Sequence, residues 1–526
     1  MHHRMRTAGC GMLGVLISAS VFAPPAAALD EVNTKRLRDA VTVNGILRHE
    51  RALQFIASAN GGTRVSGSPG FDASAGYVRR QLEQAGYRVS EQSFQFPFFE
   101  ETEPAVFKRV SPSPRPFAAD EFATMSYSGS ADVTAALQAV DVVVPIAGNP
   151  PNTSTSGCEP SDFAGFTAGN VALLQRGTCP FRQKADNATA AGAAAVIVFN
   201  EGQPQGPAQP EDRTVVVQGS LGTPGVTIPV IGTSYAIGEE LVNQTRAGAV
   251  TVHLSTTTIS QTRTTRNVIA DYTAGGGDRS QTIVVGSHLD SVPDGPGIND
   301  NGSGTATDLE TAIQIAKLGL KPRRALRFAF WGAEEEGLLG STHYVGSLGD
   351  AVGDIYANLN FDMLGSPNYV RFVYDGDNSA FPVGGTVQSG PPGSGEIERL
   401  FATYFAGQGL ATDPTAFNGR SDYGPFIDVG IPAGGLFSGA EGLKTAEQAA
   451  TYGGVAGQPY DACYHQACDT VTNLDTRALG ELGDGVAHAT WTLAKSASGL
   501  FEDESLRTRG VEARRTPTAA GHHALR

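Results

Sequence analysis

Apolar positions recur at helix spacing through the N-terminal part of the chain. Between residues 30 and 94 they include Ile46, Leu53, Ile56, Tyr77 and Leu82. Spacings of three or four residues place such side chains on one face of a helix. The segment then ends in an alternating stretch over residues 88–94, which predicts a strand. We therefore expect helices followed by a strand, as at the start of an α/β unit.

The middle of the chain has a different pattern. From residue 133 to 258, short apolar runs rich in β-branched residues alternate with turns rich in Gly, Pro and Asn. The runs cover residues 140–145, 171–174, 195–199 and 228–231. Short runs bounded by turn residues predict strands. We interpret residues 133–258 as a β-rich α+β domain that is inserted into the first unit.

After residue 266, stronger apolar runs alternate with helical patterns. The expected strands cover residues 267–271, 282–285, 326–331, 356–361 and 433–437. Such alternation predicts a parallel or mixed sheet with helices on both faces. The predicted fold class is therefore α/β, with a mixed, mostly parallel central sheet. Its domain is discontinuous, with residues 30–132 and 259–500 on either side of the insertion.

The two ends of the chain differ from the parts that we expect to fold. Residues 1–28 combine basic residues, an apolar run from Met12 to Phe22 and three alanines at 26–28, which is the pattern of a cleaved signal peptide. The run is too short to span a bilayer and no second long apolar stretch follows, so we expect a secreted protein without a membrane anchor. Residues 501–526 are charged and poor in large apolar residues, which predicts a disordered or removable tail.

Composition narrows the choice of partners. A chain of 526 residues, 40% of them hydrophobic, can build more than one core, and its formal net charge of −15 argues against a nucleic-acid partner. We expect a monomer.

Four cysteines remain after residue 28, and in an exported protein they predict two local disulfides, Cys158 with Cys179 and Cys463 with Cys468. Free buried thiols are the alternative.

Residues of the types that bind metals follow three of the expected strands. His288 and Asp300 come after the first, Glu334 and Glu335 after the second and Asp362 after the third. Because ligands collect at the carboxyl ends of strands in α/β sheets, we expect these side chains to meet at one edge. Taken singly, His288 is also consistent with an ordinary hydrogen-bonded histidine, and the three glutamates at 334–336 with a solvated helix start.

Several carboxylates at one sheet edge repel one another unless a cation lies among them. A histidine among carboxylates favours zinc over magnesium or calcium. One aspartate can bridge two zinc ions, which together hold a hydroxide and polarise a carbonyl, and a further glutamate is then free to act as a base. The chain has no Gly-x-Ser-x-Gly elbow and no phosphate-binding Gly-x-x-x-x-Gly-Lys loop. Serine hydrolase and nucleoside triphosphatase chemistry are therefore excluded.

Longer motifs surround these residues. They are residues 286–292 (GSHLDSV), 295–304 (GPGINDNGSG), 330–341 (FWGAEEEGLLGS), 360–365 (NFDMLG), 419–426 (GRSDYGPF), 434–437 (GGLF) and the cysteine loop 463–468 with Tyr464 and His465. Together they resemble the secreted bacterial aminopeptidases that use two zinc ions, of the streptomycete leucine aminopeptidase type. The resemblance covers nearly the whole chain after residue 28 and implies a fold like that of the zinc exopeptidases.

The resemblance also implies a ligand set for two Zn²⁺ ions per chain. By this resemblance, His288 and Asp362 would bind one zinc ion, Glu335 and His465 the other, and Asp300 both. The imidazoles would be oriented by carboxylates that follow them closely in the sequence, Asp290 and Asp469.

The remaining implied roles concern catalysis and the substrate pocket. Glu334 would be the general base and Tyr464 would help to stabilise the oxyanion, while Arg420 and Phe437 would line the pocket for the first residue of the substrate. One position departs from the pattern, because Tyr423 stands where relatives often carry histidine. Residues 133–258 resemble a protease-associated domain, whose usual disulfide Cys158 and Cys179 would match.

The predicted function is hydrolysis of the N-terminal peptide bond of peptides with a free N-terminus, with a preference for large apolar first residues. Two alternatives within the same fold are a carboxypeptidase and a glutaminyl cyclase. The first should present a cluster of arginines for the substrate carboxylate, of which Arg420 is the one candidate found. A third alternative is a non-catalytic binding ectodomain. The acidic composition also leaves room for a structural Ca²⁺ ion, although no EF-hand loop marks one.

Overall fold

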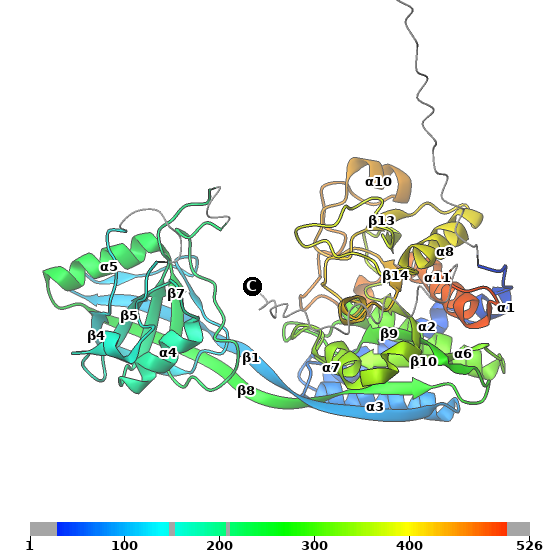
Figure 1. The fold of residues 1–526 in the computed structure, drawn as a ribbon, viewed down its shortest axis with the longest axis horizontal. Coiled ribbons are helices and arrows are strands. Elements are labelled where there is room, and N and C mark those ends of the chain that lie inside the picture. The colour runs from blue at the N-terminus through cyan, green and yellow to red at the C-terminus, as the bar shows by residue number, and fades with distance from the viewer. Residues whose placement is uncertain (1–28, 147–152, 207–210, 502–526) are drawn as a thin grey trace, which may run out of the picture.

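The structure, a computed structural model, describes residues 29–146, 153–206 and 211–501. The expected signal peptide at 1–28 and residues 502–526 of the expected tail lie outside the described residues. Figure 1 shows two folded units joined by a long ribbon of two antiparallel strands, β1 (Arg88–Ser111) and β8 (Thr251–Asp271). The larger unit contains both the N-terminal helices and the C-terminal half of the chain.

Four parallel neighbours form the centre of the larger unit. In spatial order they are β14 (Ala433–Phe437), β11 (Ile355–Phe361), β9 (Asp278–His288) and β10 (Arg324–Trp331). The end of β8 adds an antiparallel strand beside β10, and the short strands β12 (Phe372–Tyr374) and β13 (Asp413–Thr415) extend the other edge. The sheet is therefore mixed and mostly parallel, as the sequence predicts.

Alternate side chains of these strands are buried on opposite faces, so helices cover the sheet on both sides. Ile283 and Val285 of β9 pack into one large core, whereas Val284 packs into a second. The first core is shared with α2 (Val43–Ala59), α3 (Pro69–Gln84), α6 (Gly304–Lys317), α8 (Ser394–Gly407) and α11 (Thr476–Lys495). The second core is shared with α7 (Leu339–Leu348) and α9 (Gly424–Asp428). This arrangement confirms the predicted fold class.

Local signals in the sequence account for where the N-terminal helices begin. The hydroxyl of Thr42 accepts from the main chain of Gly45 at the start of α2, and Ser68 accepts from Phe71 at the start of α3, whose first residue is Pro69. Such capping satisfies main-chain N–H groups that have no partner within the helix. The remaining helices and turns of the larger unit are α1 (Lys35–Arg38), η2 (Ile298–Ser303), η3 (Gly349–Asp354), α10 (Ala446–Tyr452) and η4 (Val471–Asn473).

The smaller unit is a second, β-rich layer structure. Its strands are β3 (Phe122–Thr124), β4 (Ala131–Ala139), β5 (Val171–Gln175), β6 (Ala195–Phe199) and β7 (Val230–Thr233), and its helices are η1 (Pro160–Phe163), α4 (Phe181–Ala190) and α5 (Tyr235–Ala247). The strand expected at 140–145 is wrong. β4 ends at Ala139, and the chain turns at Asp141, whose φ of 45° does not fit a strand.

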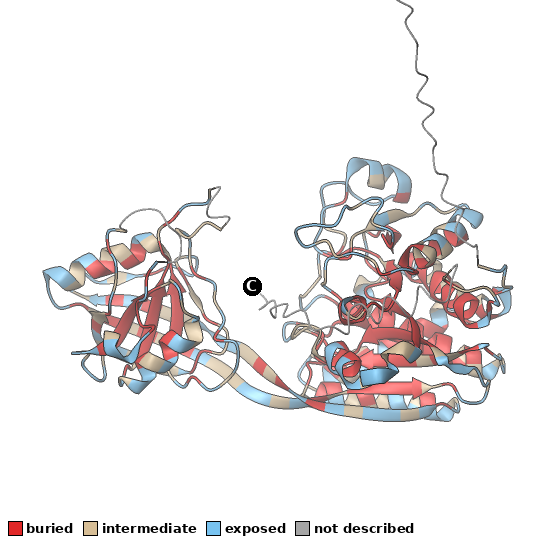
Figure 2. Cartoon of the chain, viewed as in Figure 1, coloured by how far each residue is buried: buried red, intermediate tan, exposed pale blue. Residues whose placement is uncertain are grey.

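The ribbon between the two units pairs from Arg88 with Asp271 to Ser111 with Thr251, with β2 (Arg115–Pro116) beside its far end. Figure 2 shows buried strands in both units and exposed or intermediate residues along the middle of the ribbon. The predicted insertion at 133–258 starts after β3, although β3 pairs with β7 of the smaller unit. Among the described residues, no helix has both the length and the apolar character needed to cross a membrane.

Candidate metal centre

Three adjacent parallel strands deliver acidic and imidazole side chains to one edge of the sheet. β9 ends at His288, Asp362 comes directly after β11, and Glu334 and Glu335 lie just after β10. Because the three strands are parallel, their carboxyl ends lie at the same edge. The four side chains are largely buried there. The structure thus brings together residues that lie up to 74 positions apart in the chain.

Asp300 lies between two histidines. Its Oδ1 atom is 3.1 Å from Nε2 of His288, and its Oδ2 atom is 3.1 Å from Nε2 of His465. Asp300 is in the turn η2, and His465 comes from a loop more than 160 residues later. The two oxygens of a single carboxylate therefore face two different imidazoles.

Each imidazole has a further carboxylate beside it. Asp362 Oδ1 lies 3.4 Å from His288 Nε2, and Glu335 Oε2 lies 3.2 Å from His465 Nε2. Oδ1 of Asp362 and Oε1 of Glu335 are buried and have no hydrogen-bond partner among the described residues. Buried, unpaired carboxylate oxygens are costly unless a cation is close to them. These five residues form two groups of donors that share Asp300.

The titration of the centre shows the same shortage of positive charge. Burial raises the pKa of Glu335 to about 7, and burial also raises the pKa of Glu334 well above its usual value. Burial opposes the charging of His465, but its contacts with Asp300 and Glu335 raise its pKa to about 10. In the absence of a metal, protons therefore provide the positive charge that the carboxylates need.

The donor set fits a divalent metal such as zinc. Imidazole nitrogen with carboxylate oxygen is a set that zinc accepts well, whereas magnesium and calcium prefer oxygen alone. Two trios have donor atoms close enough to share an ion: His288, Asp300 and Glu335, and His288, Glu334 and Asp362. Glu334 thus lies near enough to His288 and Asp362 to be a ligand by distance alone.

Two further carboxylates lie close to the candidate ligands. Asp290 Oδ1 lies 3.5 Å from Nδ1 of His288, on the side of the ring away from Asp300. The contacts of Asp469 differ from our expectation that it orients His465. Its two oxygens accept instead from the main-chain N–H groups of Asn299 at 2.7 Å and Asp300 at 3.0 Å. Through these two hydrogen bonds, Asp469 fixes the turn η2, which carries Asp300.

A cavity of about 240 Å³ opens from the carboxylates. One wall is apolar and aromatic, with Met363, Phe372, Tyr374, Phe437 and Tyr460. The rings of Phe372 and Phe437 are stacked, with centroids 5.8 Å apart. Such a cavity has room for one amino-acid side chain next to the candidate ligands.

The cavity is also lined by a short chain of polar contacts. Arg420 donates to Oε1 of Glu441 at 2.6 Å and to the hydroxyl of Tyr464 at 3.2 Å. The ring of Tyr464 stacks on that of His465, with centroids 3.8 Å apart. The structure thus brings Arg420, Phe437 and Tyr464 to the same cavity as the carboxylates.

Comparison with known proteins decides the family. The model of peptidase family M28 matches residues 267–490, and that of the PA domain matches residues 138–241. An aminopeptidase of Pseudomonas aeruginosa is 44% identical over 463 residues, which cover 88% of this chain and 82% of the relative. The chain belongs to peptidase family M28. The match at 138–241 confirms that this M28 peptidase has an inserted protease-associated domain.

Two further relatives of the M28 peptidase span most of its length. Leucine aminopeptidase 2 of Arthroderma otae is 38% identical over 505 residues, which cover 94% of this chain and 93% of the relative. The solved structure of an aminopeptidase from Aneurinibacillus sp. strain AM-1 is 26% identical, has a TM-score of 0.60 and covers 89% of this chain and 98% of its own. The fold is thus shared with a known aminopeptidase, and the sequence similarity extends over most of both chains.

The motif at 419–426 holds contacts that the sequence did not reveal. Ser421 donates from its hydroxyl to Oδ2 of Asp362 at 2.6 Å, and Asp422 is fully buried, which raises its pKa to about 7. Tyr423, the position that departs from the resemblance, accepts with its hydroxyl from the main chain of Asn418 and Gly419. Tyr423 therefore holds the loop before Arg420. The motif itself was the one signal that could have drawn attention to these residues.

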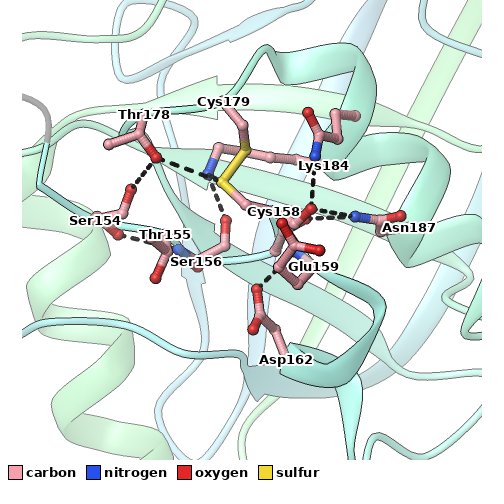
Figure 3. Close-up of a disulfide and its surroundings, with 12 residues drawn as sticks. Ser154, Thr155, Ser156, Cys158, Glu159, Asp162, Thr178, Cys179, Lys184 and Asn187 are labelled. Carbon is pink, nitrogen blue, oxygen red and sulfur yellow. Dashed lines mark hydrogen bonds between the residues drawn. A yellow bond between two sulfur atoms is a disulfide. The ribbon is translucent and has the colours of Figure 1, made fainter.

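Both predicted disulfides of the M28 peptidase form. Cys463 pairs with Cys468 and closes the loop that carries His465, whose φ is 56°. Cys158 pairs with Cys179 in the inserted domain. Figure 3 shows this second bond beside Lys184 and Asn187 of α4, which donate to the main-chain oxygens of Ser156 and Cys158. The second bond thus ties the loop before η1 to the start of α4.

A third acidic group lies outside the centre. Asp375, Asp377 and Glu398 bring their carboxylates together in the larger unit. Main-chain N–H groups already donate to them, at 2.7 Å from Phe381 to Asp375 and at 2.8 Å from Gly376 to Glu398. Because these bonds satisfy the carboxylates, the group adds no support to the structural Ca²⁺ ion for which the composition leaves room.

Proposed function

We propose that this M28 peptidase is a zinc-dependent aminopeptidase that releases the first residue of peptides. The observation that carries the proposal is the position of Asp300, whose two oxygens each lie 3.1 Å from a different imidazole. A bridging carboxylate between two sets of donors is what a pair of metal ions needs. Full-length relatives that are named aminopeptidases support the same conclusion.

Two zinc ions would be held by five residues. His288, Asp362 and Asp300 would hold one, and Glu335, His465 and Asp300 the other. Bound zinc supplies Lewis acidity, which polarises the scissile carbonyl and lowers the pKa of water. Asp290 would keep the His288 ring in place through Nδ1, 3.5 Å away.

Glu334 is the proposed general base. Its carboxylate lines the cavity, and burial raises its pKa toward the range in which a carboxylate can both take up and release a proton. It would accept a proton from the attacking water and donate that proton to the leaving amine. Tyr464, held by Arg420 at 3.2 Å, would donate its hydroxyl hydrogen to the oxyanion.

The aromatic wall supports a preference for large apolar first residues. Phe372 and Phe437 face the cavity beside Met363, so a leucyl side chain would lose more contact with water there than an alanyl one. The similarity to a protein named leucine aminopeptidase 2 agrees with this. We further propose that the enzyme is exported after cleavage near residue 28 and acts as a monomer.

The test is hydrolysis of chromogenic amides by the purified mature protein. We expect cleavage of leucyl but not of N-acetyl-leucyl amide, loss of cleavage on chelation, recovery on zinc addition, and loss in Glu334→Ala. A carboxypeptidase would cleave N-blocked peptides with a free C-terminus, and a cyclase would convert N-terminal glutamine instead. If the zinc-loaded protein cleaves none of these substrates, the remaining interpretation is a non-catalytic binding ectodomain.

A further inference from the structure

Arg64 is fully buried next to the metal centre, in the connection between α2 and α3. It lies outside the segment 267–490 that matches family M28. Its guanidinium donates three hydrogen bonds, all to main-chain carbonyls: Nε to Pro296 at 2.9 Å, Nη1 to Leu289 and Nη2 to Gly297. A buried guanidinium whose N–H groups donate to main-chain carbonyls holds the loop that carries those carbonyls.

The three carbonyls lie at both ends of one loop. Leu289 directly follows the ligand His288, and Gly297 comes three residues before the ligand Asp300. The main-chain N–H of Arg64 also donates to the hydroxyl of Ser291 at 2.9 Å, and that hydroxyl donates to Gly295 at 3.1 Å. A single planar group therefore joins the start and the end of the segment that separates His288 from Asp300.

Helix α2 carries a second buried group beside the same turn. Glu50 is fully buried, and burial raises the pKa of its carboxyl group well above the usual value. It packs against η2, since a Cβ atom at Gly302 would lie 2.8 Å from its Oε2 atom. Among the carboxyl groups whose charges would act on Arg64, that of Glu50 acts most strongly. Glu50 thus links the N-terminal helices to the turn that carries Asp300.

We propose that Arg64 is a positioning residue of the metal centre, which sets the spacing of His288 and Asp300 by holding the loop between them. The inference rests on the proposed function, because it takes those two residues as zinc ligands. Lysine keeps the charge but has no planar fork, so it cannot reach three carbonyls in this geometry. Replacement of Arg64 by lysine should therefore weaken the binding of the metal.

The test compares Arg64→Lys with Arg324→Lys. Arg324 is a matched control because it is also buried and donates to three main-chain carbonyls, those of Leu493, Ser496 and Ser498. It stands at the opposite end of β10 from the centre. Zinc affinity is measured on metal-free protein by competition with a chromophoric chelator, and thermal unfolding is followed alongside. We expect about tenfold weaker zinc binding in Arg64→Lys and wild-type affinity in Arg324→Lys.

Equal zinc affinity in the two variants would overturn the inference while leaving the proposed function intact. A wild-type protein that binds no zinc would overturn both. If Arg64→Lys does not fold, Ser291→Ala decides instead, because it removes the hydroxyl that accepts from the main chain of Arg64 and donates to Gly295. We then expect roughly fivefold weaker zinc binding, which is the typical net effect of about one hydrogen bond. Wild-type zinc affinity in Ser291→Ala would overturn the inference in that case.

Discussion

Glu334 and Glu335 are neighbours in the chain, but their surroundings differ. Glu335 Oε2 lies 3.2 Å from Nε2 of His465, whereas Glu334 Oε2 lies 3.9 Å from Nε2 of His288, and Glu334 lines the cavity. We expect Glu334→Gln to lower kcat by about 10² to 10⁴ while zinc is retained, since a general base contributes that much. Glu335→Gln should lose zinc together with activity. Metal content after dialysis and kcat on leucyl amide measure the two effects separately.

The distances around Glu334 allow one alternative to the assignment of Glu334 as base and Glu335 as ligand. Because Glu334 lies close enough to His288 and Asp362 to bind the same ion, it could be a ligand instead of a base. Equal loss of zinc from Glu334→Gln and Glu335→Gln would establish that alternative. Asp375→Asn serves as a control, since it removes a buried carboxylate charge outside the centre.

The expected preference for large apolar first residues can be tested at Phe437. Its ring stacks on Phe372 in the wall of the cavity, so Phe437→Ala removes apolar surface that a leucyl side chain would contact. We expect the ratio of kcat/KM for leucyl over alanyl amide to fall about tenfold, which corresponds to the loss of one or two methylene contacts. An equal loss for both substrates would mean that the ring supports the cavity without selecting the first residue.

Sequence motifs identify the side chains that form the centre, but they do not identify the side chains that position the main chain around it. His288, Asp300, Glu335 and Asp362 could be proposed because each stands at a strand end or in a Gly-rich turn with a recognisable spacing. Arg64 stands in no such pattern, and its role depends on three carbonyls more than 220 positions away. Contacts to main-chain atoms carry no residue-type signature, so a sequence cannot show them.

The element that carries His465 is a loop without regular structure, and its disulfide is the closest constraint on it. Cys463 and Cys468 bracket His465, and Asp461 accepts from the main chain of Cys463 at 2.8 Å. We expect the double variant Cys463→Ser with Cys468→Ser to bind zinc about tenfold more weakly, because the loop then loses order before binding. The chelator concentration that removes half of the zinc measures this.

The inserted domain offers the control for this prediction. Cys158→Ser with Cys179→Ser removes a disulfide of the same chain that contacts no residue of the metal centre among those described. This variant should keep wild-type zinc retention. Similar zinc loss in both double variants would show that disulfide removal acts through general stability and not through the His465 loop.

Periodicity predicted the elements of the fold better than it predicted their lengths. The strands expected at 195–199, 326–331 and 433–437 coincide with β6, β10 and β14 or differ at one end. The two ribbon strands were recognised only at 88–94 and 267–271, although β1 has 24 residues and β8 has 21. Residues 99–106 of β1 and 257–264 of β8 are exposed or half-buried, so they lack the alternation that marks a strand packed on one side. Phe96 and Phe98 do alternate and are buried, and the prediction missed them.

For the whole molecule, the centre makes stability depend on pH and on metal. Burial raises the pKa of Glu335 and of Asp469 to about 7, and His465 reaches about 10 despite its burial. In an unfolded chain these groups titrate near their ordinary values, about 4 for carboxyls and 6.5 for histidine. The folded, metal-free protein therefore holds more protons than the unfolded chain in the neutral range. The contribution of these three groups to stability is complete at low pH and falls as pH rises from their unfolded to their folded pKa values.

Zinc should reverse this trend, because metal would replace the protons on Glu335 and His465, the two of these groups that are proposed ligands. We expect the Tm of the metal-free larger unit to fall from about pH 4 to 7 through the two carboxyl groups, and to fall further up to about pH 10 through His465. The gain in Tm on zinc addition should grow over the same range. Calorimetry with and without zinc at several pH values measures both slopes. In Glu335→Gln, the slope of the metal-free protein should be smaller, since one of the raised groups no longer titrates. A gain in Tm that does not change with pH would mean that zinc binds elsewhere, because a centre that exchanges protons for metal must be linked to pH.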